Sequence, residues 1–235
     1  MTLSEVMTEL KDLGHEDTRK IYLNQGGTGE YFGVKVADLK TIAKKTKLDH
    51  ELADELMMTN NGDAQYLAGL MADPKLVTVE ELHAWAKNAT GYWISEFAIP
   101  GIAADSTHGW DIGLEWIESA DDKVSSAGWA TLANVTTVKP DDELDIEKIK
   151  SLLERVGKEL GNSPNRTRYA MNGFVISVGS CVVGLLDEAQ NVAAALGKVE
   201  VDMGETACKV PLATEKIEKI LDSKRYGKKR KKARC

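Results

Sequence analysis

The chain has few of the residues that define several common classes of protein. Its 235 residues include three cysteines, Cys181, Cys208 and Cys235, which are widely spaced and form no CxxC pair. An odd number of dispersed cysteines favours free thiols in a reducing compartment over a disulfide framework. Residues 1–14 carry charges throughout, without the apolar centre of an export signal, so we expect a cytoplasmic protein.

Motifs that hold metals or nucleotides are also missing. The histidines are isolated from one another, with no HExxH pattern and no Cys/His cluster. The glycine-rich residues 25–29 follow no predicted strand and precede no GK[ST], which favours a flexible connection over a phosphate-binding loop. We therefore predict neither a metal nor a cofactor.

Only one long apolar run is present, from residue 169 to residue 186. Its length is close to the lower limit of a membrane span, about 18 residues. It contains Asn172, Ser177 and Ser180, however, and a buried central helix of a helical protein has a similar composition. We favour the buried helix and expect no membrane partner, with a membrane span as the alternative.

Four similar stretches dominate the rest of the sequence. Each follows an amphipathic segment, opens on a polar, glycine or proline residue and then becomes small and apolar; they begin near Asp63, Gly91, Asp122 and Pro164. Starts that lie roughly 30 to 40 residues apart are typical of stacked helix pairs. Since one pair cannot bury its apolar stripe alone, the pattern predicts an all-α, right-handed α-solenoid with these four stretches side by side along a binding face.

Local signals place several helix starts. Thr78–Glu81 has the pattern of a capping box, and Asp145 precedes apolar residues spaced three and four apart. Ser163 and Pro164 suggest an N-cap followed by proline at the first helical position.

Two short stretches interrupt the helical pattern. Pro100 falls within a predicted helix and should kink or divide it, with Ile99 moved out of the α region. Residues 198–203 alternate apolar and polar side chains, which predicts a strand or an extended connection.

Charge is distributed unevenly along the chain. Of its 30 basic residues, eight lie between Lys224 and Arg234, so the remainder has 22 basic and 37 acidic residues. We expect residues 1–223 to form a single solenoid domain and residues 224–235 to be a disordered basic tail. The tail would bind DNA phosphates in a salt-dependent way through Lys228, Lys229, Arg230, Lys231 and Lys232, and the alternative is a solvated tail that only balances the acidic body.

Three segments carry a family resemblance: YFGVKVADLKTIAKK (31–45), YWISEFAIP (92–100) and RYAMNGFVISVGS (168–180). Together they resemble the DNA alkylation repair proteins of the AlkD type, over nearly the whole chain. The resemblance implies a superhelix of HEAT-like helix pairs whose concave face binds double-stranded DNA carrying an alkylated base. In active members it also implies hydrolysis of the N-glycosidic bond.

The chain departs from that family at the catalytic position. Active members have the pattern WWDSVD, where this chain has Tyr92-Trp93-Ile94-Ser95-Glu96-Phe97. Trp93 matches a site aromatic and Phe97 replaces the catalytic aspartate, so the resemblance implies that both lie at the DNA. Glu96 is the remaining candidate catalytic residue, although on an α-helix it points about 100° away from the aspartate's direction. Alternatively, Trp93 and Phe97 are core residues and Glu96 is a solvated helix charge.

The rest of the implied site is also changed. Phe174 matches an aromatic that frames the lesion, while Ser126 and Ser177 replace arginines that hold the DNA backbone; Arg166 and Arg168 could substitute for them. Two functions stay open, namely a DNA-binding repair protein, catalytic or not, and a non-enzymatic solenoid that binds a protein or another nucleic acid. The fold alone does not separate them.

Overall fold

The computed structural model describes residues 1–234, and this part of the chain is helical, as predicted, with one isolated β-bridge between Glu30 and Asn61 and no strand. Residues 198–203 form an extended connection. The thirteen α-helices of the described residues are α1 (Leu3–Asp12), α2 (Glu16–Asn24), α3 (Val36–Thr46), α4 (His50–Met57), α5 (Gly62–Met71), α6 (Val79–Asn88), α7 (Ile99–Asp105), α8 (Gly109–Trp116), α9 (Asp122–Val138), α10 (Ile146–Glu159), α11 (Asn165–Cys181), α12 (Leu186–Leu196) and α13 (Ala213–Asp222). Short 3₁₀ turns lie at Asp141–Glu143 and Leu160–Asn162, and a π-helical turn lies at Ile94–Ala98.

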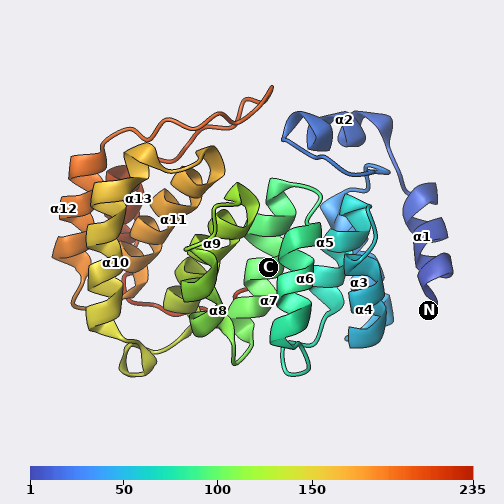
Figure 1. The fold of residues 1–235 in the computed structure, drawn as a ribbon, viewed down its shortest axis with the longest axis horizontal. Helices are drawn as coiled ribbons and strands as arrows, with labels where there is room; N and C mark the ends of the chain where they lie inside the picture. The colour runs from blue at the N-terminus through green and yellow to red at the C-terminus, as the bar shows by residue number, and fades with distance from the viewer. Residues whose placement is uncertain (235) are drawn as a thin grey trace.

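The helices stack in a curved row from the N-terminal end to α12 and α13 (Figure 1). Helix α5 contacts the π turn and α7, these contact α9, and α9 contacts α11. These elements are the four stretches that the sequence predicts side by side, and they begin within a few residues of the predicted positions. The α-solenoid is therefore confirmed.

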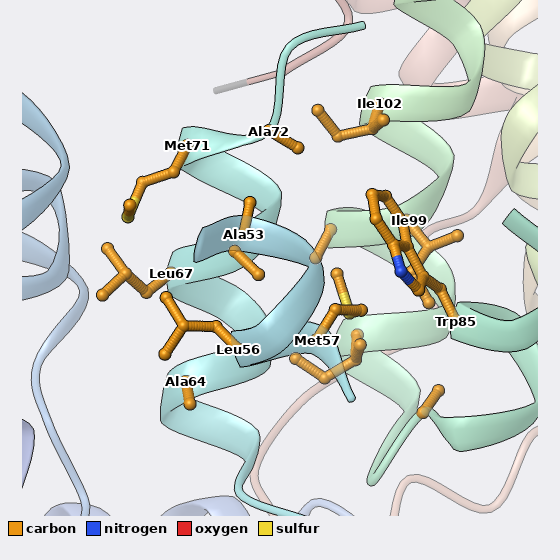
Figure 2. Close-up of a cluster of buried hydrophobic side chains, with 14 of the residues drawn as sticks. Ala53, Leu56, Met57, Ala64, Leu67, Met71, Ala72, Trp85, Ile99 and Ile102 are labelled. Carbon is orange, nitrogen blue, oxygen red and sulfur yellow. The ribbon is translucent and has the colours of Figure 1, made fainter. Parts of the chain in front are cut away.

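Two large clusters of buried side chains hold the row together. The first includes Leu56, Leu67, Met71, Trp85 and Ile99, which come from four different helices (Figure 2). The second cluster draws on α9 to α13 in the same way. Since full burial of one such aliphatic side chain contributes about 1.5–3 kcal/mol, the stability of each helix depends on its neighbours.

Most predicted caps are present. Glu81 N–H donates to Thr78 Oγ1 at 3.2 Å and Thr78 N–H donates to Glu81 Oε2 at 2.7 Å, which completes the capping box of α6. Asp145 caps α10 by accepting from Lys148 N–H at 2.9 Å.

The cap of α11 differs from the prediction. Pro164 is itself the N-cap residue, and the Ser163 hydroxyl donates to the Glu159 carbonyl. The free N–H groups of Arg166 and Thr167 instead donate to the carboxylate of Asp122, at 3.0 and 2.7 Å. The first residue of α9 thus caps the helix of the next repeat, a contact that local sequence does not reveal.

The prediction for Ile99 is wrong. Ile99 keeps α-helical angles, φ −65° and ψ −48°, and its N–H donates to Ile94 O across the π turn. The missing N–H of Pro100 removes one donor from the ladder, and the chain absorbs this loss by widening one turn rather than by breaking the helix.

The expected disorder of the basic tail is also contradicted over the part that the structure describes. Residues 224–234, hereafter the basic segment, run back along the solenoid toward its middle (Figure 1). The acidic body supplies carboxylates for it: Lys229 lies 2.6 Å from Asp141, and Arg234 lies 3.1 Å from Asp105. Cys235 lies outside the described residues.

The connection between α12 and α13, residues 197–212, reaches across to α2 (Figure 1). Asn165 exchanges two hydrogen bonds of 2.8 Å with the backbone of Asp202, and Gly204 packs directly against the carbonyl of Asn24. None of the helices within residues 1–234 is long and apolar enough to cross a membrane.

Candidate nucleic-acid-binding site

A pocket of about 560 Å³ lies where the four stretches meet. Its walls come from α5, the π turn, α9 and α11, and Arg230, Ala233 and Arg234 of the basic segment form one border. The side chains that give it an aromatic and weakly polar character are Tyr66, Trp93, Phe97, Asn134, Tyr169 and Ser177. The pocket is thus on the face that the repeat pattern predicts for binding.

Trp93 lines the pocket and also belongs to an aromatic stack. Its ring lies 4.6 Å from that of Tyr66, nearly parallel, and 4.3 Å from that of Tyr22. Burial raises the pKa of Tyr22 to about 12, with a smaller contribution from the nearby charge of Asp63. Trp93 is therefore both packed and in contact with the pocket.

Phe97 is the most exposed aromatic side chain of the pocket, with 55% of its surface accessible. The alternative that places it in the core is therefore wrong. An exposed phenyl ring beside a weakly polar pocket offers a flat face on which a nucleobase can stack.

Glu96 is not a solvated charge. It is 5% exposed, and Arg166 donates Nε–H to Oε1 at 2.7 Å and Nη2–H to Oε2 at 2.6 Å. Burial raises the pKa of Glu96, and the guanidinium of Arg166 opposes that rise. Because both carboxylate oxygens accept from one cation, the charge available to a developing oxocarbenium ion is largely compensated.

The guanidinium of Arg166 contacts other side chains in addition to Glu96. Its guanidinium lies 4.9 Å from the ring of Tyr92 and 4.6 Å from that of Tyr169, and Nη1 lies 3.1 Å from the sulfur of Met203. With 7% of its surface exposed, it cannot grip a DNA backbone in this conformation, so the suggested substitution for the family's arginines is wrong here. Arg168 is half-buried, and its Nη2 donates to Asn165 at 3.4 Å.

Phe174 belongs to the core. It has no exposed surface and lies edge-on to Trp129, with ring centroids 5.3 Å apart. The implied lesion contact is therefore wrong for Phe174, and Tyr169, on the same helix, faces the pocket instead. Ser126 is likewise fully buried, whereas Ser177 lines the pocket.

Tyr66 and Tyr169 are the pocket residues that the sequence reasoning missed. Each lies four residues after the first residue of its helix, Gly62 in α5 and Asn165 in α11. This shared position after the helix start is the one signal that the sequence holds for both.

The five predicted basic contacts fall into two groups. Lys229 donates to Thr136 O at 2.8 Å, and Arg230 donates to Asn134 Oδ1 at 2.8 Å. Lys228, Lys231 and Lys232 are exposed.

A sequence model of the family described as "DNA alkylation repair enzyme" matches residues 6–194. The chain belongs to this family. It is 36% and 35% identical to two uncharacterized proteins, from Listeria innocua and Listeria monocytogenes, over 224 residues that cover 93% of this chain and 97% of each relative.

A solved structure is also similar, with a TM-score of 0.91, 38% identity and full coverage of both chains. It is described as a new family of proteins related to the HEAT-like repeat DNA glycosylases with affinity for branched DNA structures. The predicted family and fold are thus confirmed.

Proposed function

We propose that this protein binds branched DNA on its concave face and does not excise bases. The observation that carries the proposal is the pocket lined by the four repeated stretches, which contains the exposed ring of Phe97 together with Tyr66 and Tyr169. The full-length similarity to a structure described as having affinity for branched DNA supports the choice of DNA as the partner.

The aromatic pocket gives a physical reason for a preference for branches. In an intact duplex each base is covered by its neighbours, whereas stacking is interrupted at a branch point, so a base there leaves its pair at lower cost. Stacking of a base on an aromatic side chain contributes about 1–3 kcal/mol and depends little on sequence. A pocket with several aromatic side chains therefore favours a junction over a linear duplex.

Hydrolysis of the N-glycosidic bond of an alkylated purine is the second candidate function. It is favoured by the position of Glu96 in the pocket wall, where its carboxylate would stabilise an oxocarbenium ion. The bidentate pair with Arg166 argues against it, because the stabilising charge is already used within the fold. We therefore expect the protein to release no methylated base.

Fluorescence anisotropy with a labelled four-way junction and a linear duplex of the same arm sequence tests the proposal. We expect the junction to bind at least about tenfold more tightly, which corresponds to one well-stacked base. Equal affinities would contradict the branch preference, and no binding to either DNA would favour the solenoid that binds a protein. Release of free base from methylated duplex DNA, abolished by Glu96→Gln, would instead establish the second candidate.

A further inference from the structure

The C-terminal end of the basic segment is bound to the C-terminal end of α7. Ala233 N–H donates to Asp105 Oδ1 at 2.7 Å, and Arg234 donates from Nε to Asp105 Oδ2 at 3.1 Å and from Nη1 to Ala72 O at 2.7 Å. Gly101 permits this approach, since a Cβ there would lie 3.2 Å from Cγ of Arg234. Ala233 is 5% exposed and adds a small apolar contact.

The N-terminal half of the basic segment is bound to α11 and α9. Gly227 N–H donates to Ser180 O at 3.0 Å, and Arg230 N–H donates to Thr137 O at 2.7 Å. The segment thus crosses α11, α9, α7 and the end of α5 in turn. Its position is fixed by contacts to all four stretches that form the pocket.

Three lysines of the segment take no part in this attachment. The side chains of Lys228, Lys231 and Lys232 are exposed, and within residues 1–234 they have neither an ion-pair partner nor a hydrogen-bond partner. Lys231 and Lys232 lie between Arg230 and Ala233, both of which border the pocket. Their backbone therefore lies next to the border of the pocket.

These lysines matter for DNA binding because the rest of the chain is acidic. Outside residues 224–234 the protein has 22 basic and 37 acidic residues, and such a body repels phosphate. Attachment of the segment pairs Asp105 and Asp141 with cations and holds three exposed, unpaired lysines on the surface of the solenoid.

We infer that the basic segment is a fixed part of the DNA-binding surface with two separate sets of residues. Arg230, Ala233 and Arg234 attach it to the solenoid, and Lys228, Lys231 and Lys232 bind the phosphates that flank the base in the pocket. This inference rests on the proposed function, which it deepens by naming the phosphate contacts.

The test compares the wild-type protein with a triple variant, Lys228→Gln, Lys231→Gln and Lys232→Gln, for binding to a four-way junction over a series of salt concentrations. Each lost phosphate contact lowers the magnitude of the negative slope of log K against log salt by about 0.9, so we expect this magnitude to decrease by about two to three, with unchanged thermal stability. A control triple variant at exposed lysines outside the pocket, Lys11→Gln, Lys87→Gln and Lys216→Gln, should keep the wild-type slope.

The attachment is tested by Asp105→Ala, which keeps every basic residue and removes one negative charge. Charge alone would then strengthen DNA binding, whereas loss of the fixed position should weaken it several-fold. Wild-type affinity or tighter binding in Asp105→Ala would overturn the positional role, and a wild-type salt slope in the first triple variant would overturn the phosphate contacts. If the wild-type protein binds no junction, the proposed function itself fails.

Discussion

Among single residues, Glu96 and Arg166 determine how much of the family's chemistry is retained. They lie 70 positions apart in the sequence and form a bidentate pair in which each side chain is less than 10% exposed. Local reasoning could locate Glu96 next to the catalytic position but could not show its partner. The family resemblance placed Trp93, Phe97 and Phe174 at the DNA, and Phe174 is buried instead, because a matching aromatic does not reveal the direction of its side chain.

Removal of one partner of the Glu96–Arg166 pair should lower the stability of the fold. We expect Arg166→Met to lower the free energy of unfolding by about 3–5 kcal/mol, since it leaves a buried carboxylate without compensation. The double variant with Glu96→Gln should recover much of that loss. Urea unfolding of the three proteins is the measurement, and a loss below about 1 kcal/mol in Arg166→Met would show that water reaches the pair.

The aromatic stack around Trp93 predicts an effect at alkaline pH. Because burial raises the pKa of Tyr22 to about 12, the folded protein holds this proton after the unfolded chain, with a pKa near 10, has lost it. Stability should therefore fall between about pH 10 and pH 12. In Tyr22→Phe this part of the decrease should be absent, as followed by urea unfolding at several pH values; an unchanged decrease would place its cause elsewhere.

At the scale of helices, local sequence signals predict where helices begin, but contacts between repeats determine other features of their ends and turns. The sequence placed the starts of α5, α9 and α11 within about one residue, because caps and small apolar runs are local features. It did not predict the π turn at Ile94–Ala98 or the cap of α11 by Asp122, since both depend on neighbouring helices. The π turn also invalidates an angle derived from an ideal α-helix for Glu96.

Two cap variants compare a cap between repeats with a cap within one helix. Asp122 accepts from two backbone N–H groups of α11 and from the Thr167 hydroxyl, whereas Asp145 makes an exposed cap on its own helix only. We expect Asp122→Ala to cost about 2–3 kcal/mol and Asp145→Ala about 1 kcal/mol in urea unfolding. Equal losses would show that the contact between repeats adds nothing.

For the whole molecule, two extended segments connect helices that lie far apart in the sequence. Residues 197–212 reach from α12 to α2, and the basic segment crosses the pocket-forming helices. Composition alone suggested a mobile tail, because eight basic residues without apolar periodicity form no core of their own. Its attachment depends on acceptors such as Asp105 and Ala72, which lie more than 120 positions away in the sequence.

The attached state predicts slow hydrogen exchange in the basic segment. Ala233 N–H is buried in a hydrogen bond to Asp105 and should be protected in the wild-type protein. In Asp105→Ala it should exchange at the rate of an unstructured peptide, while α9 stays protected. Fast exchange of Ala233 in the wild-type protein would mean that the segment is detached most of the time.

The central claim is that DNA binds on the concave face, and one pair of variants tests it most directly. Phe97 is 55% exposed in the pocket and Leu48 is 56% exposed outside it, so Phe97→Glu and Leu48→Glu add the same charge at equally accessible positions. In anisotropy titrations with a four-way junction, we predict at least about tenfold weaker binding for Phe97→Glu, from lost stacking and repulsion of phosphate, and wild-type binding for Leu48→Glu. Wild-type affinity in Phe97→Glu, with its thermal stability unchanged, would contradict the account.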